Sequence, residues 1–216
     1  MTSKLKIKRT FKTRRGFSLS EFAIVLAIMG LVLGALWGVV AIVRENGKRQ
    51  EMTQIMVVLV QNIRDFYSSR IRVADKDNAT DMASVTSYLL QQNVIPSDLI
   101  RTRSASTLVA DHPWGATSAS GATLSEGGIL VDGWSNGARF FRIQLRGLEY
   151  SSCVALTDRL SGPDMVGLYL LSINGSASHT TLPVSPDVAM TECVKSPSGS
   201  QNYMDFVFYL RSQVSK

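Results

Sequence analysis

The sequence predicts an α+β protein in which one long N-terminal helix packs on an antiparallel β-sheet domain. Two observations lead to this fold class. Apolar residues fill the chain from residue 22 to 43 and then continue at helical spacing to about residue 72. From residue 129 onward, the chain instead holds short segments of strand-like pattern separated by turn-forming residues. The 216 residues are enough to bury a core of their own.

The first predicted element contains an uncharged apolar run of 22 residues, from Phe22 to Val43. At 1.5 Å per residue a helix of this length measures about 33 Å, enough to cross a hydrocarbon core of about 30 Å. The run is too long for the apolar region of a secretory signal peptide, which usually has about 7–15 residues, and no Ala-x-Ala-like cleavage site follows it. We therefore expect a membrane-spanning helix.

The charge distribution predicts the orientation of this helix. Residues 1–16 hold seven of the 23 Lys and Arg residues and no acid. By the positive-inside rule, residues 1–16 stay in the cytoplasm and the chain after about Val43 lies outside. The other 16 basic and 17 acidic residues give residues 17–216 a formal charge of −1, although the whole chain carries +6. No basic surface remains for nucleic acid, so no specific nucleic-acid binding is predicted.

Beyond the membrane the same helix is predicted to continue, from about Phe17 to about Arg72 in total, because no Pro or Gly interrupts residues 48–72. Its apolar residues in this half recur every three or four positions: Met52, Ile55, Met56, Leu59, Ile63, Phe66 and Tyr67. An amphipathic half of this kind should pack on a globular domain, which we expect to span residues 73–216.

Four strands are predicted in that domain, at Ile129–Val131, Phe140–Leu145, Val166–Ile173 and Tyr203–Leu210. The third is nearly continuously apolar, which is typical of a central strand. Residues 101–128 are rich in Ser, Thr, Ala and Gly and are expected to form loop with short excursions.

Two short helices are predicted between these segments. One is capped by Thr80 or Asp81 and runs through Leu90. The other is capped by Ser151. Its one apolar face is made by Cys153, Leu156, Thr157 and Leu160.

Two features of the apolar run allow more than one interpretation. Glu21 stands at its start, and a carboxylate entering hydrocarbon is either a functional group with a cationic partner or an interfacial residue that reaches the headgroups. Gly30, Gly34 and Gly38 lie on one stripe of the helix and permit close approach of another helix, although glycine is also common in membrane helices generally.

No catalytic pattern is present in the sequence. The two histidines, His112 and His179, belong to no metal-binding motif, and there is no G-x-S-x-G, Walker A or G-x-G-x-x-G sequence. His112 stands in a predicted loop, where we expect it to be solvated. We therefore expect no enzyme, no metal site and no cofactor.

The residues from Arg14 to Glu21, followed by the apolar run, resemble the N-terminus of type IV prepilins. The resemblance implies cleavage between Gly16 and Phe17 by prepilin peptidase and N-methylation of Phe17, and it makes Glu21 the fifth residue of the mature chain. Residues 1–16 would then be a cytoplasmic leader, residues 17–43 the transmembrane and filament-core helix, and residues 44–72 its amphipathic half. The amine of Phe17 in one subunit would be neutralised by Glu21 of its neighbour.

The later part of the chain is similar to type IVb pilins in particular. Phe140–Leu145, then Gly147-Leu148 and Ser152-Cys153, look like the strand, turn and helix that open the disulfide-bounded region of that group. Cys193 precedes the last predicted strand, as the pattern expects. Two Cys in an exported domain most simply form one disulfide, Cys153–Cys193, with two buried free thiols as the alternative.

The resemblance implies a structural subunit of a type IVb-like pilus, of the thin-pilus, conjugative or toxin-coregulated kind. Such a subunit waits in the inner membrane, is polymerised by an inner-membrane assembly platform and an assembly ATPase, and ends as a homopolymer in an extracellular filament. Gly30, Gly34 and Gly38 would serve helix packing in that filament. Two alternatives remain open: a minor pilin or type II secretion pseudopilin, and an uncleaved single-span envelope protein that acts as a receptor or enzyme.

Overall fold

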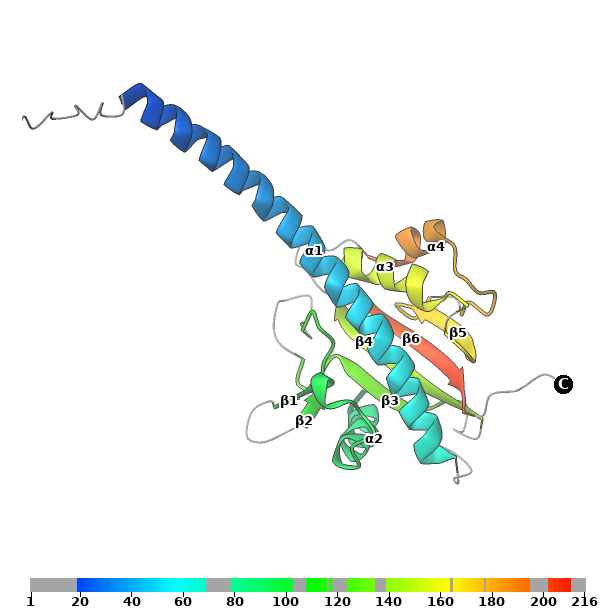
Figure 1. Cartoon of the computed structure of the whole chain (residues 1–216). Coiled ribbons are helices and arrows are strands. Elements are labelled where there is room, and N and C mark those ends of the chain that lie inside the picture. Colours follow the sequence, from blue (N-terminus) through cyan, green and yellow to red (C-terminus); the bar gives the residue numbers. More distant parts are fainter. Residues whose placement is uncertain are drawn as a thin grey trace, which may run out of the picture. The chain divides into compact units, whose positions relative to one another are not determined.

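The computed structural model describes residues 19–68, 79–102, 108–115, 117, 124–134, 139–163, 165–176, 178–194 and 202–210. The chain forms two compact units, residues 1–45 and residues 46–216. Helix α1, Leu19–Tyr67, begins in the first unit and ends in the second (Figure 1).

The part of α1 in the first unit carries the apolar run, and its large side chains are exposed. Within the described residues, α1 is the one helix long and apolar enough to cross a membrane, with a mean hydropathy of 2.6 in its most apolar window. This measure rests on length and composition alone.

The C-terminal end of α1 lies five residues before the predicted one. The helix ends at Tyr67, and the backbone N–H of Ser68 donates to the carbonyl of Asp65 at 3.2 Å. A bond over three residues instead of four tightens the last turn, as is common where a helix stops. The predicted start at Phe17 lies outside the described residues.

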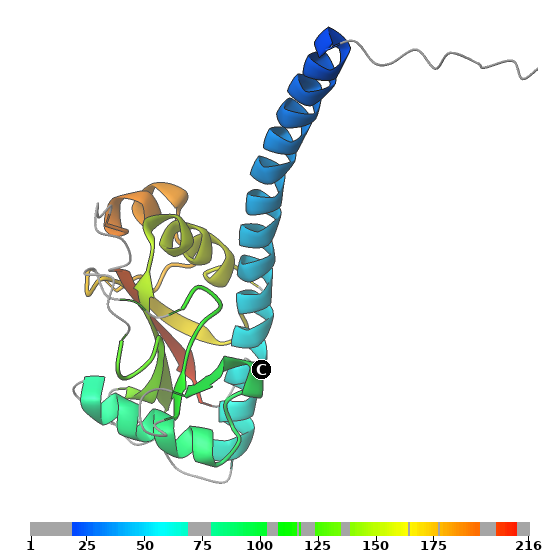
Figure 2. The same ribbon diagram turned by 90° about the vertical axis from the view of Figure 1, so that its left-hand side faces the viewer.

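The second unit is built on a six-stranded antiparallel sheet with the order β1-β2-β3-β4-β6-β5. Its strands are β1 Ile100–Thr102, β2 Leu108–Ala110, β3 Ile129–Trp134, β4 Phe140–Leu148, β5 Leu168–Ile173 and β6 Asn202–Tyr209. The second half of α1 lies along one face of this sheet in both views (Figures 1 and 2). The predicted α+β class is therefore confirmed.

The core of the unit lies between α1 and that face of the sheet. The α1 side chains that enter it are buried, and they are Met52, Met56, Leu59, Val60, Ile63 and Tyr67. They meet alternate residues of the central strands, such as Phe141 and Ile143 of β4 and Phe206 and Phe208 of β6. Alternation of this kind is what places every second side chain of a strand on the same face. The predicted amphipathic half is therefore the part of α1 that packs.

Strand β5 is an edge strand, so its predicted central position is wrong. Its nearly continuous apolar run reflects burial on both faces, with Leu170, Leu171 and Ile173 all buried. Its outer edge is partly covered as well, because the backbone of Leu171 exchanges hydrogen bonds with that of His179. An apolar run reports burial and not the position of a strand in the sheet.

The other three predicted strands are present with altered ends. Strand β3 extends to Trp134 and β4 to Leu148, while β6 begins one residue early and ends at Tyr209. A bulge interrupts the β4–β6 pairing between Arg146 and Leu148. Gly147 occupies it with a φ of +72°, and a Cβ there would collide with the backbone of Thr117, so the bulge requires glycine.

Helix α2, Ala79–Gln91, covers the edge of β3 where β2 has ended. Strand β2 pairs with β3 only through Ala110 and Ile129. Two residues further along β3, the hydroxyl of Thr86 on α2 accepts from the N–H of Val131 at 2.9 Å. A side chain thus replaces the missing strand partner. The predicted cap positions, Thr80 and Asp81, lie inside α2, so the predicted start of this helix is wrong.

Helices α3, Tyr150–Leu160, and α4, Pro186–Glu192, pack on each other beside the sheet. The buried face of α3 contains Cys153, Leu156, Thr157 and Leu160, as predicted. Its N-cap is Glu149, so Ser151 lies inside the first turn and the predicted cap is wrong. The sequence does not predict helix α4, strand β1 or strand β2, which have seven, three and three residues.

Candidate assembly site

The predicted site residues of the N-terminal segment lie on one stretch of helix. Glu21 stands in the first turn of α1 and is exposed. Gly16 and Phe17 lie outside the described residues. A carboxylate in the first turn also faces the positive end of the helix dipole, which makes Glu21 compatible with the start of α1.

The glycine stripe further along α1 is open. A Cβ placed on Gly30, Gly34 or Gly38 would meet no heavy atom within 4 Å. Among the described residues, packing inside the subunit therefore does not explain why these positions lack side chains. A stripe without side chains allows the backbone of a second helix to approach closely.

The two cysteines are joined, as predicted. Cys153 on α3 and Cys193 at the C-terminal end of α4 form a disulfide with an S–S distance of 1.98 Å and a Cα–Cα distance of 6.0 Å. Both residues are buried. The bond closes a loop over a sequence separation of 40 residues and ties the two helices together next to the start of β6.

Two asparagines hold the segment beside the disulfide, and sequence reasoning missed both. The buried amide of Asn202 accepts from the N–H of Val194 at 2.6 Å and from the amide of Asn174 at 2.8 Å. The same Asn174 amide donates to the carbonyl of Glu192 at 2.9 Å. In the sequence, the only signal for Asn202 is its place at the boundary between a polar stretch and the last strand-like segment.

Arg64 joins α1 to the end of β6 and to the turn before β5, and sequence reasoning missed it as well. Its Nε donates to the carbonyl of Tyr209 at 3.0 Å and its guanidinium to the carbonyl of Val166 at 2.9 Å. Gly167 has a φ of +77°, and a Cβ there would collide with the guanidinium. Burial lowers the pKa of Arg64 from its ordinary value, yet an arginine stays charged. Among the described residues, no carboxylate forms an ion pair with it.

His112 is buried, so the expectation of a solvated loop histidine is wrong. Only 3% of the residue is exposed, and its Nε2–H donates to the carbonyl of Arg146 at 2.8 Å. Its Nδ1 is buried without a hydrogen-bond partner in the described part of the chain. The ring of Trp114 packs edge to face with the imidazole, with 5.7 Å between the ring centroids.

Comparisons with known proteins gave two kinds of match, one to a family model at the N-terminus and one to solved structures. Residues 11–37 match the family model described as the prokaryotic N-terminal methylation motif. The chain is similar to the crystal structure of the type IVb pilin from Salmonella typhi, with a TM-score of 0.50 and 20% identity, over 71% of this chain and 95% of that one. The chain has the fold of a type IVb pilin.

Two further solved structures resemble the chain more distantly. One is TcpA, a type IV pilin from Vibrio cholerae El Tor biotype, with 11% identity and a TM-score of 0.47 over 74% of this chain and 98% of that one. The other is the NMR structure of the type IVb pilin PilS from Salmonella typhi, with 21% identity and a TM-score of 0.40 over 71% and 93%. No curated protein sequence matches the chain.

The pilin fold should lose stability as the pH falls below about 6.5, the ordinary pKa of histidine. Burial lowers the pKa of His112 in the folded state, so the unfolded chain binds more protons in this range and protonation favours unfolding. We expect the urea midpoint of the detergent-solubilised chain to be lower at pH 5.0 than at pH 7.5.

A His112→Gln variant is the control for this prediction, since it can keep the bond to the carbonyl of Arg146 but does not titrate. It should lose most of the difference between the two pH values. Asp205 acts in the opposite direction, because burial raises its pKa and its contribution to stability improves as the pH falls. An equal or larger loss of stability in the variant at pH 5.0 would contradict the role given to His112.

Proposed function

We propose that the chain is the precursor of a structural subunit of a type IVb-like pilus. One observation carries the proposal: a methylation motif at residues 11–37 and a type IVb pilin fold occur in one chain. Each is compatible with other roles when taken alone. Together they combine a processing signal with the architecture of a filament subunit.

In this proposal prepilin peptidase cuts between Gly16 and Phe17 and the new N-terminus is methylated. Residues 1–16 are the cytoplasmic leader that is removed, residues 17–43 form the membrane and filament-core helix, and residues 44–72 include its amphipathic continuation. The globular domain, residues 73–216, lies in the periplasm before assembly and on the outside of the filament afterwards. The cluster of basic residues in the leader and the length of the apolar run support this orientation.

Assembly moves the apolar half of α1 out of the lipid and into a bundle of like helices. The exposed apolar side chains of this half supply the surface to be buried, and the open stripe of Gly30, Gly34 and Gly38 lets neighbouring helices approach. The positive N-terminus that cleavage creates at Phe17 would meet Glu21 of a neighbour. A buried ion pair of this kind sets the register between subunits more than it adds stability.

The polymer is a helical homopolymer with heterologous contacts, in which each subunit uses different surfaces toward its two neighbours. Repetition of such a contact gives an open helix instead of a closed ring. The partners are therefore other copies of the chain, prepilin peptidase, and the inner-membrane assembly platform with its ATPase. No cofactor takes part in this role.

Electron microscopy of filaments sheared from cells, together with immunoblots of the sheared and membrane fractions, tests the function. We expect filaments in which this chain is the dominant protein. A trace amount of the chain in filaments made of another subunit would assign it to a minor pilin or pseudopilin. A chain found only in the membrane would contradict the proposal.

Replacing Gly16 by a bulky residue, as in Gly16→Leu, should block processing. The peptidase has to accept the residue directly before the cut, and a large side chain there fills space that glycine leaves empty. We expect uncut precursor in the inner membrane, seen as a slower band on an immunoblot, and no filaments. Substitution of Ser3, far from the cut site, is the matched control and should mature normally. Normal maturation of the Gly16 variant would remove the assignment of the cleavage site.

A further inference from the structure

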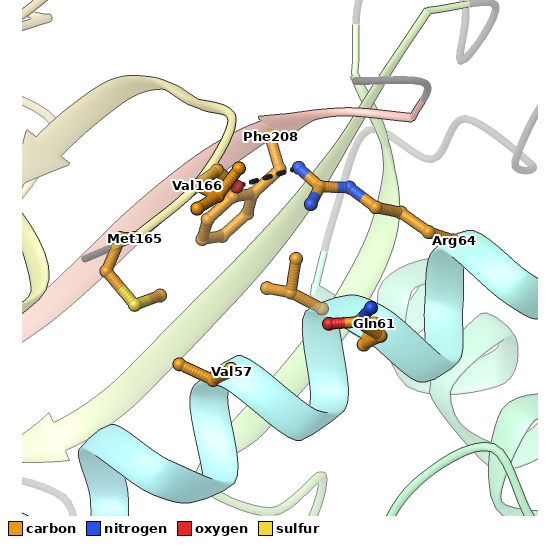
Figure 3. A pocket seen from close by; sticks show the side chains of 7 residues that line it. Val57, Gln61, Arg64, Met165, Val166 and Phe208 are labelled. Carbon is orange, nitrogen blue, oxygen red and sulfur yellow. Dashed lines mark hydrogen bonds between the residues drawn. The ribbon is translucent and has the colours of Figure 1, made fainter. Parts of the chain in front are cut away.

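A small apolar pocket opens between α1 and the turn that leads into β5 (Figure 3). It has a volume of about 70 Å³, enough for several water molecules or part of one apolar side chain. The side chains that line it are Val57, Val60, Gln61, Arg64, Met165, Val166 and Phe208. The apolar surface continues at its rim, since Val57 is 42% exposed and Val166 is 66% exposed.

Among the described residues that line the pocket, Arg64 carries a positive charge. Arg64 reaches across it from α1, and within the described part of the chain its guanidinium donates to the backbone carbonyls of Tyr209 and Val166. Carbonyl oxygens satisfy donors but bring no negative charge. An apolar pocket beside a cation of this kind suits a partner that presents an apolar side chain next to a carboxylate.

Helix α4 of the same chain presents that combination. Asp187 and Met190 of α4 are three residues apart, and both are exposed. Met190 is 49% exposed, so the helix shows apolar surface to solvent beside the carboxylate, and Val194, 45% exposed, follows two residues beyond the end of α4. Residues three and four apart share one face of a helix.

The pocket and this face lie at opposite ends of strand β5. Gly167, directly before β5, contacts Arg64 at the pocket, while Asn174, directly after β5, binds the carbonyl of Glu192 on α4. A strand of six residues spans about 20 Å. The two surfaces therefore cannot meet within one subunit, but copies stacked along the direction of β5 would bring them together.

We propose that α4 of one subunit docks into the α1–β5 pocket of the next, with Met190 over the pocket and Asp187 beside Arg64. This contact rests on the proposed polymerisation and assigns residues to one of its interfaces. It is heterologous, because the pocket and the α4 face are different surfaces, and it therefore repeats without closing.

Variants at exposed positions test the contact without disturbing the fold, because surface substitutions usually change stability little. Met190→Glu and Val166→Glu in the full-length chain should each lower the yield of sheared filaments by on the order of tenfold, as for a residue at the centre of an interface. Leu108→Glu on β2 is the matched control, since Leu108 is 40% exposed and lies outside both surfaces, and it should assemble normally.

Charge exchange tests the polar part of the contact. Asp187→Lys should reduce filament yield, since it places a second cation beside Arg64. Adding Gln61→Glu, an exposed position on the pocket rim, should restore part of the yield. Equal yields from all of these variants and the wild type would overturn the proposal.

Photo-crosslinking decides between this contact and other arrangements of the filament. A photoreactive amino acid in place of Val166 should produce a dimer, and mass spectrometry should locate the crosslink in the peptide that contains Met190. Filaments that form with the crosslink in a different segment, or with no crosslink, would overturn the inference and leave the proposed function intact. A wild-type chain that never leaves the membrane would instead refute the proposed function.

Discussion

The variant Glu21→Ala should insert into the membrane and be cleaved, but it should not assemble. Removal of the carboxylate makes the apolar helix more hydrophobic, so insertion has no reason to fail. Glu21 is the fifth residue after the proposed cut between Gly16 and Phe17, so processing should remain largely intact. Each added subunit, however, would bury the amine of Phe17 without a partner, at a cost of about 3–5 kcal/mol by analogy with broken buried ion pairs.

The measurement is electron microscopy of sheared filaments beside an immunoblot of the subunit in the membrane. Glu51→Ala is a matched control, because Glu51 is an exposed acid of the same helix beyond the apolar run. We expect near-normal filaments from the control and almost none from Glu21→Ala, with similar membrane pools. Wild-type filament yield from Glu21→Ala would make the carboxylate an ordinary interfacial residue.

The second large effect concerns the disulfide. Replacement of both cysteines, Cys153→Ser with Cys193→Ser, should lower the free energy of unfolding by about 4 kcal/mol, the value of the chain-entropy model for a loop of this length. The double variant avoids leaving one reactive thiol. A decrease of this size in the free energy of unfolding is a large fraction of the stability of an ordinary domain. The amount of protein in the envelope should therefore fall as well.

Urea unfolding of the detergent-solubilised chain measures this effect. The wild type under reducing conditions serves as the control and should unfold at nearly the same urea concentration as the double variant. Unchanged unfolding of the double variant would show that the helices α3 and α4 are held by packing and by the asparagine network alone. Rapid thiol labelling of the native exported protein would contradict the disulfide itself.

The sequence predicts the long elements of this fold well because their patterns extend over many residues. The apolar and then amphipathic pattern of α1 is sustained for some 45 residues, and the alternation in β4 and β6 continues over whole strands. Short elements escape such reasoning: β1 and β2 have three residues each, which is too few for a period to show. The order of the strands in the sheet is not predicted from such patterns either, because β5 is apolar on both faces and yet lies at the edge.

Some residues of the candidate site can likewise be predicted from the sequence, and others cannot. Glu21, the three glycines and the two cysteines could be found from the sequence because each is an unusual residue type for its surroundings. Arg64 and Asn202 could not, because their roles depend on carbonyl groups that come from distant segments, such as those of Tyr209 and Leu148. The exposure of Met190 likewise becomes visible only when α4 is placed on its neighbours.

The mass of the mature N-terminus tests the central claim most directly. The subunit is purified from the membrane or from sheared filaments, and its N-terminal peptide is analysed by mass spectrometry. Our account predicts a chain of 200 residues that begins at Phe17 and carries one methyl group on its α-amine. A chain that retains residues 1–16, or one that begins at any other residue, would contradict it.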